Sequence, residues 1–229
     1  MPEVIINGPE GRIEGRYTPA RTPNAPIALM LHPHPQHGGT MNNRIVYALH
    51  QLYTRRGFGT LRFNFRGVGR SQGSFDRGEG ELSDAASALD WLQSTNPDAP
   101  ACWIAGYSFG AWIGMQLLMR RPEITGFVSI SPPANLFDFT FLAPCPASGL
   151  IVHGGRDNLV PKQSVETLIE KVAKQKDVVI ELKLIADADH FFATQLEEVD
   201  RHVNAYMEKR ASPTKGGTPA RRATAGAAR

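Results

Sequence analysis

Short apolar runs alternate with longer amphipathic stretches along the chain, and this alternation predicts its elements. Runs of strand length cover Val4–Asn7, Arg12–Tyr17, Ile27–Leu31, Thr60–Phe65, Cys102–Ala105, Gly126–Ile130, Gly149–His153 and Val178–Ile185. Helical spacing is found from Asn42 or Asn43 to about Arg56 and over Glu81–Gln93, Phe109–Arg120, Pro161–Lys174 and Phe191–Lys209. The first two strands predict an opening hairpin at a sheet edge. The whole pattern predicts an α/β fold, with a mostly parallel sheet of about eight strands and helices on both faces.

The composition is that of a globular protein that can bury a core. The chain has 229 residues, of which 41% are hydrophobic, so one α/β domain is expected. No run of eighteen apolar residues predicts a membrane span, and the N-terminus lacks the pattern of a signal peptide. Two cysteines are too few for a disulfide framework and are not spaced as metal ligands. A cytoplasmic location follows as an expectation.

The basic charge of the chain is concentrated at its C-terminal end. The formal net charge is +3, and residues 211–229 hold Lys215, Arg221, Arg222 and Arg229 with no acid, so the remainder carries −1. We therefore expect a catalytic domain over residues 1–210 and a disordered basic tail over 211–229. No nucleic-acid module or basic stripe with interleaved aromatics is visible, so nucleic-acid binding through the tail is a weak alternative.

The segment Gly106-Tyr107-Ser108-Phe109-Gly110 joins a predicted buried strand to a predicted helix. It fits G-x-S-x-G, in which the serine occupies a sharp turn and glycines on both sides avoid steric clashes. Such a turn places the hydroxyl at a helix N-terminus, where partial positive charge favours a developing anion. Ser108 is therefore a candidate nucleophile, although the pentapeptide could also be an ordinary glycine-rich turn.

A serine nucleophile needs a base, and the base needs an orienting carboxylate. Asp157 and His190 each follow a late predicted strand, and the chain order Ser, Asp, His is the expected one. Asp187 and Asp189 are rival acids beside His190, and Asp157 could instead cap the next helix.

An oxyanion formed by attack at Ser108 needs two hydrogen-bond donors. The backbone N–H of Phe109 is the first candidate. The loop after Ile27–Leu31 should supply the second, and Pro33 and Pro35 have no N–H, which leaves His34, or secondly Gln36. The group His32, His34 and His37 could suggest a metal site, but no carboxylate or cysteine accompanies it, so no metal is expected.

These motifs together resemble the α/β-hydrolase superfamily. The segments Leu31–Met41 and Phe65–Asp76 also resemble a small bacterial branch of serine hydrolases or esterases without a cap domain, with a His-Pro-His-Pro oxyanion loop. The resemblance covers about residues 4–208. It implies the α/β-hydrolase fold and a Ser108–His190–Asp157 triad, but it does not imply a substrate. Pro33 replaces the glycine of the commoner His-Gly pattern.

Lids in this superfamily commonly enter between the strands at Gly126–Ile130 and Gly149–His153. Only Ser131–Ser148 lies there, which is too short for a large cap domain, so an open site is expected. An extended backbone would place Phe137, Phe139 and Phe141 on one side, either as a pocket wall or as ordinary core. Phe191 is a further candidate for substrate binding. The loop Arg66–Phe75 has two possible roles: it lies beside the active site, or it is a structural turn that caps the helix starting at Glu81. Arg66 could pair with a carboxylate of the protein or of the substrate.

The expected function is hydrolysis of small carboxylic esters through an acyl-enzyme, with no cofactor. A thioesterase, lactonase or peptidase could use the same triad. A non-catalytic protein that binds a ligand or partner on the same fold is the alternative from another class. The sequence indicates neither the physiological substrate nor the oligomeric state.

Overall fold

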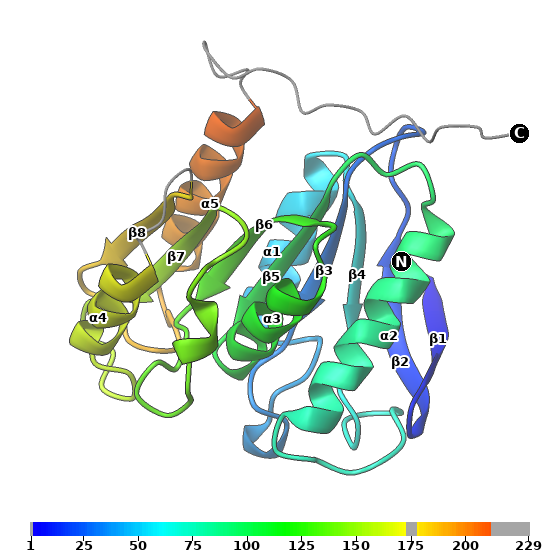
Figure 1. The fold of residues 1–229 in the computed structure, drawn as a ribbon, viewed down its shortest axis with the longest axis horizontal. Coiled ribbons are helices and arrows are strands. Elements are labelled where there is room, and N and C mark those ends of the chain that lie inside the picture. The colour runs from blue at the N-terminus through cyan, green and yellow to red at the C-terminus, as the bar shows by residue number, and fades with distance from the viewer. Residues whose placement is uncertain (1, 173–177, 212–229) are drawn as a thin grey trace, which may run out of the picture.

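The computed structural model describes residues 2–172 and 178–211, which form one sheet covered by helices (Figure 1). The sheet has eight strands in the order β1-β2-β4-β3-β5-β6-β7-β8. The strands are β1 (Glu3–Gly8), β2 (Gly11–Thr18), β3 (Ile27–Leu31), β4 (Gly59–Phe63), β5 (Cys102–Tyr107), β6 (Ile124–Ile130), β7 (Gly149–Gly154) and β8 (Ile180–Ile185). The β1–β2 hairpin is antiparallel and lies at one edge, as predicted. The next pair, β2 and β4, is also antiparallel. All further neighbours in the sheet order, from β4 through β3, β5, β6 and β7 to β8, are parallel.

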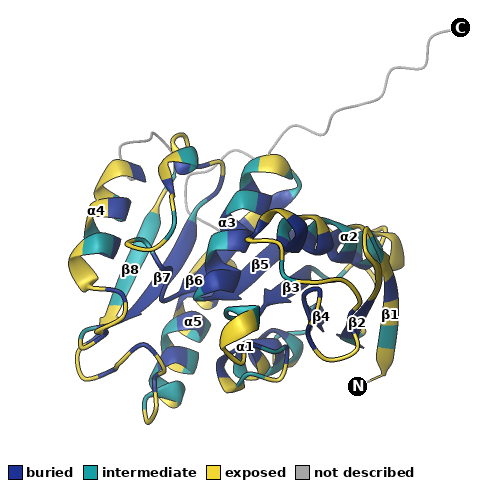
Figure 2. Cartoon of the chain, turned by 90° about the horizontal axis from the view of Figure 1, so that it is seen from below, coloured by how far each residue is buried: buried dark blue, intermediate teal, exposed yellow. Residues whose placement is uncertain are grey.

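Helices cover both faces of the sheet, and two separate apolar cores result. The helices are α1 (Arg44–Arg55), α2 (Glu79–Thr95), α3 (Phe109–Arg120), α4 (Lys162–Val172) and α5 (Leu196–Ala211). One core packs α2, α3 and α4 against the sheet, and the other packs α1 and α5 against the opposite face. Figure 2 shows the buried strands between these two helical layers. Strands enclosed in this way are apolar on both faces, which explains the continuous runs in the sequence.

The last helix begins later than predicted. Residues 191–195 form turns, and α5 starts at Leu196 instead of Phe191. Phe192 has a φ of 50°, which lies in the left-handed region and interrupts a right-handed helix. The predicted end of the preceding helix at Lys174 and residues 212–229 of the predicted tail lie outside the described residues, whereas Ala211, predicted as the first residue of the tail, is the last residue of α5.

The segment between β6 and β7 is not extended around its phenylalanines. Asp138 accepts hydrogen bonds from the N–H and the hydroxyl of Thr140, at 2.8 and 2.9 Å. This local turn leads into a short 3₁₀ helix, Thr140–Leu142. The expectation that Phe137, Phe139 and Phe141 share one side of an extended stretch is therefore wrong. The segment carries no cap domain.

None of the helices in residues 2–172 and 178–211 is long and apolar enough to cross a membrane.

Candidate active site

Ser108 lies in the sharp turn between β5 and α3. Its backbone angles are φ 52° and ψ −119°, a strained conformation for a residue with a side chain. A Cβ atom on Gly106 would lie 2.4 Å from the carbonyl oxygen of Gly110, and one on Gly110 would lie 2.4 Å from that of Leu31. Both glycines are thus required for the close approach of strand, turn and helix.

The structure brings Ser108, His190 and Asp157 into one chain of contacts. His190 Nε2 lies 3.0 Å from Ser108 Oγ, and His190 Nδ1 lies 2.7 Å from Asp157 Oδ2. The three residues come from the loops that follow β5, β8 and β7, at the carboxyl ends of adjacent or nearby strands. Because the carboxyl ends of parallel strands lie at the same edge of a sheet, the fold brings residues far apart in sequence together there.

The carboxylate of Asp157 is buried but well supported. Its Oδ1 accepts the N–H groups of Leu159 and Val160, at 2.9 and 2.8 Å. Burial disfavours the charge, but the hydrogen bonds from His190 and Val160 outweigh it and hold the pKa of Asp157 below its usual value. An ionised Asp157 accepts a hydrogen bond from Nδ1–H of His190. The proton of the neutral imidazole is then on Nδ1, and Nε2 presents its lone pair to the serine.

The two rival acids make other contacts. Asp187 forms an ion pair with Arg156 at 2.7 Å, with both side chains exposed. Asp189 Oδ1 accepts the N–H of Phe191 at 2.9 Å and so stabilises its own loop. Asp157 is the acid whose carboxylate reaches the imidazole of His190.

Two residues that sequence reasoning missed hold the His190 loop in place. Tyr107 donates its hydroxyl to the carbonyl oxygen of His190 at 3.0 Å, and burial raises the pKa of this phenol, so it stays protonated. Arg44, the first residue of α1, donates to the carbonyl oxygens of Phe191, Phe192 and Ala193. Arg44 is nearly 150 residues away along the chain, and no local pattern could have identified this contact.

The two candidate oxyanion donors lie on facing segments. In the described part of the chain, no hydrogen bond uses the N–H of His34 or of Phe109. The N–H of Gln36, by contrast, donates to His34 Nδ1 at 3.2 Å, which favours His34 over Gln36 as the second donor. The ring centroids of His34 and Phe109 lie 5.0 Å apart. Phe75, from the glycine-rich loop, packs on both rings at 4.9 and 6.0 Å.

His32 is fully buried and bonds to both neighbouring segments of the chain. Its Nδ1 bonds to the carbonyl oxygen of Pro33 at 2.7 Å, and its Nε2 accepts the N–H of Phe65 at 3.0 Å. Burial lowers the pKa of His32 to about 4, so the ring is neutral at pH 7. Both ring nitrogens are engaged, which leaves none for a metal. Among the described residues, no group of three or more His, Cys, Asp or Glu side chains could hold a metal ion.

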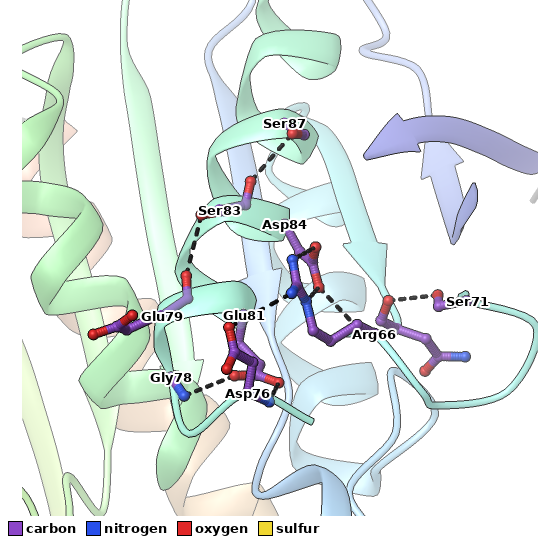
Figure 3. Close-up of polar contacts among 10 residues, drawn as sticks. Arg66, Ser71, Asp76, Gly78, Glu79, Glu81, Ser83, Asp84 and Ser87 are labelled. Carbon is purple, nitrogen blue, oxygen red and sulfur yellow. Dashed lines mark hydrogen bonds and ion pairs between the residues drawn. The ribbon is translucent and has the colours of Figure 1, made fainter. Parts of the chain in front are cut away.

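Arg66 meets a protein carboxylate and lies outside the cavity. Its guanidinium forms a bidentate pair with Asp84 of α2, at 2.8 and 3.0 Å, and its own N–H donates to the same carboxylate (Figure 3). Glu81 accepts the N–H of Gly78 at 2.7 Å and so caps the start of α2. The Arg66–Phe75 loop is thus a structural turn that also carries Phe75 to the candidate site.

A cavity of about 560 Å³ opens onto Ser108 and His190. Its lining combines polar residues, among them His34, His37 and Asn43, with apolar ones, among them Leu136, Phe137, Leu159, Val160 and Phe191. Leu136, Leu159 and Phe191 are exposed large apolar residues. Of the phenylalanines considered from the sequence, Phe137 and Phe191 line this cavity. Phe139 and Phe141 do not line it; their rings stack on each other with centroids 6.0 Å apart.

A serine in a sharp strand-to-helix turn and a mostly parallel sheet without a lid are typical of the α/β-hydrolase fold. Comparison with known proteins agrees. The model of the X-Pro dipeptidyl-peptidase family (S15 family) matches residues 16–143, more than half of the chain. The chain belongs to this family within the α/β-hydrolase superfamily.

Solved structures of bacterial proteins resemble the whole domain. A protein of unknown function from Agrobacterium tumefaciens, described as a candidate α/β hydrolase, is 60% identical, with a TM-score of 0.90 over 91% of this chain and 96% of its own. An α/β serine hydrolase homologue from Coxiella burnetii is 32% identical, with a TM-score of 0.83 over 90% and 97%. A serine hydrolase without a lid from Xanthomonas campestris is 28% identical, with a TM-score of 0.80 over 93% and 96%. This chain is thus similar to hydrolases that lack a lid.

Proposed function

We propose that this hydrolase cleaves small carboxylic esters, with Ser108 as nucleophile, His190 as base and Asp157 as the orienting acid. The observation that carries the proposal is the continuous set of contacts from Asp157 through His190 to Ser108, at the wall of an open cavity. A small-molecule ester is the expected partner, and the chemistry requires no cofactor.

The proposed reaction uses His190 twice. Ser108 Oγ attacks the acyl carbon while His190 Nε2 takes its proton, and ionised Asp157 stabilises the imidazolium that forms. The N–H groups of Phe109 and His34 donate to the oxyanion of the tetrahedral intermediate. His190 then gives its proton to the leaving alcohol. Water, activated by the same imidazole, attacks the acyl-enzyme and releases the acid.

The open cavity favours short acyl chains. The described chain has no lid over Ser108, and three of the apolar side chains that line the cavity, Leu136, Leu159 and Phe191, are exposed. Each buried methylene stabilises binding by only about 0.8 kcal/mol, and a shallow wall buries few of them. We therefore propose a maximum of activity at acyl chains of about two to six carbons.

Peptidase activity is the second candidate, because the matching family is described as X-Pro dipeptidyl-peptidases. An enzyme that removes dipeptides must bind the terminal ammonium group of its substrate, for which a carboxylate is the natural partner. The described lining of the cavity contains no Asp or Glu. This favours esters over peptides. Thioesters and lactones need no such carboxylate, so their turnover is to be measured beside that of simple esters.

The deciding experiment is labelling with a fluorophosphonate probe, followed by peptide mapping and p-nitrophenyl acetate turnover. Ser108 should be the labelled residue, and Ser108→Ala should lose both label and turnover while it stays folded. Ser83→Ala is the matched control, because its hydroxyl bonds only to Glu79 on the exposed side of α2. An unlabelled wild-type protein, or an active Ser108→Ala variant, would remove Ser108 from the mechanism and leave a binding protein as the better explanation.

A further inference from the structure

A second hollow adjoins the candidate active site. It has a volume of about 610 Å³ and lies between the segment 134–143 and α4. The catalytic cavity, at about 560 Å³, ends at the same segment. Within the described chain, Phe137 is the one residue that lines both hollows. The ring of Phe137 is therefore the partition between them.

Several contacts hold this partition in place. The Phe137 ring stacks on Trp112, with centroids 4.4 Å apart and planes at 28°, and it meets Phe109 edge-on at 5.8 Å. Trp112 Nε1 donates to the carbonyl oxygen of Asp138 at 3.0 Å, which ties the next residue to the same helix. A ring packed in this way forms a fixed wall of the catalytic cavity.

The groove behind the wall combines an apolar surface with a polar one. Its apolar lining residues are Ala134, Phe137, Phe139, Ala143, Leu168 and Val172, and these would contact an aliphatic chain. Its polar lining residues are Asp138, Thr140, Gln163, Ser164, Thr167 and Lys171. It meets the catalytic cavity at Phe137, which lies beside Leu136, another apolar residue of the cavity lining. An aliphatic chain extended past position 137 would enter this groove.

We propose that Phe137 sets the limit of acyl-chain length, and that the groove between 134–143 and α4 is an acyl subsite closed off by its ring. The inference rests on the proposed ester hydrolysis at Ser108. Removal of the ring joins the two hollows. Substrates with aliphatic chains of about eight to twelve carbons then gain buried methylenes, each of which raises kcat/KM by about fourfold when fully buried.

The test compares Phe137→Ala with wild type on p-nitrophenyl esters from acetate to laurate. The ratio of kcat/KM for decanoate to that for butyrate should rise by about tenfold or more, through several partly buried methylenes. Phe137→Leu keeps part of the wall and should shift the ratio less, in the same direction. Phe141→Ala is the matched control, because it removes the same ring from the same segment without opening the catalytic cavity, and its ratio should stay at the wild-type value.

Labelling separates this inference from the proposed function. Wild type and both Phe137 variants are treated with short- and long-alkyl fluorophosphonates, and modification of Ser108 is followed over time. If Ser108 of the folded wild type reacts with neither probe, the proposed function fails, and this inference with it. If the short probe reacts but neither Phe137 variant reacts faster with the long one, only the acyl subsite is disproved. An equal shift in Phe141→Ala would also overturn it, since loosening of the segment would then be the cause.

Discussion

Asp157 has both carboxylate oxygens engaged by donors that stabilise its charge. Oδ2 faces His190 at 2.7 Å, and Oδ1 accepts two backbone N–H groups. A second imidazole, that of His153, lies 3.8 Å from Oδ2 and bonds to the carbonyl oxygen of Val160 at 2.9 Å. A buried charge with this support can hold the imidazole of His190 in one tautomer without itself taking a proton.

Substitution of Asp157 by asparagine tests this role. Asn would present a donor or an uncharged acceptor to Nδ1, so His190 would adopt the wrong tautomer, and kcat should fall by about 10³–10⁴-fold. Asp187→Asn is the control, because it removes only an exposed ion pair with Arg156 and should keep nearly full activity. Steady-state kinetics on a short-chain ester measure both. A larger loss in Asp187→Asn or Asp189→Asn than in Asp157→Asn would contradict the assignment.

At the scale of residues, the sequence could predict those groups whose role follows from a local pattern. Ser108 lies in a motif, and Asp157 and His190 each follow a late strand, so their meeting at one sheet edge could be anticipated. Tyr107 and Arg44 could not be anticipated in this way. Their contacts with residues 190–193 depend on how two distant loops meet, and neither residue is set apart by its sequence neighbours.

At the scale of elements, predictions succeeded where apolar spacing and end signals agreed. The strand Ile27–Leu31 and the helix Phe109–Arg120 have the predicted bounds. The predicted start of α5 was wrong because the apolar residues Phe191 and Phe192 continue the helical spacing of the sequence. In the structure they lie in a turn whose carbonyl oxygens accept hydrogen bonds from Arg44. Phe137, Phe139 and Phe141 were wrongly predicted to lie on one side of an extended backbone. Their alternation with polar residues also fits an Asx-type turn, which Asp138 forms here.

The turns after β7 and β8 pack backbone against backbone, which makes Gly154 critical. A Cβ atom at Gly154 would lie 2.5 Å from the carbonyl oxygen of Ala188 and 2.7 Å from that of Asp189. Backbone cannot yield as a flexible side chain does, so Gly154→Ala should push the His190 loop away from Asp157. We expect kcat to fall by about 10²-fold, because a shift of about 1 Å suffices for such a loss.

Gly114→Ala provides the comparison for Gly154→Ala. It adds the same methyl group in α3, but there the Cβ atom would meet the side chains of Ile104 and Leu31, at 2.9 and 3.1 Å. These side-chain ends can adjust, and activity should stay near the wild-type value. Thermal unfolding of both variants separates a loss of activity from a loss of fold. Equal kcat in Gly154→Ala and wild type would mean that the loop tolerates the displacement.

At the scale of the whole molecule, two fully buried histidines connect separate elements of the sheet region. His32 links the loop after β3 to Phe65, two residues beyond β4, and His50 of α1 bonds to Thr60 of β4 at 3.1 Å. Burial lowers the pKa of each to about 4, and the positive charge of Arg62 adds to the effect at His50. Both side chains are fully buried, so protonation in the folded state is unfavourable.

These histidines should make the fold sensitive to mild acid. In the unfolded chain an imidazole titrates near pH 6.5, so between about pH 6.5 and 4 the unfolded state binds more protons than the folded state. The free energy of unfolding therefore decreases as the pH falls through this window, by up to about 1.4 kcal/mol per pH unit for each histidine. The depressed pKa of Asp157 acts in a separate range, below about pH 4, where protonation of its carboxylate removes further stability. Urea unfolding at pH 7, 6, 5 and 4.5 measures the slope, which His50→Gln should reduce. An unchanged slope in His50→Gln would show that this imidazole is not the titrating group.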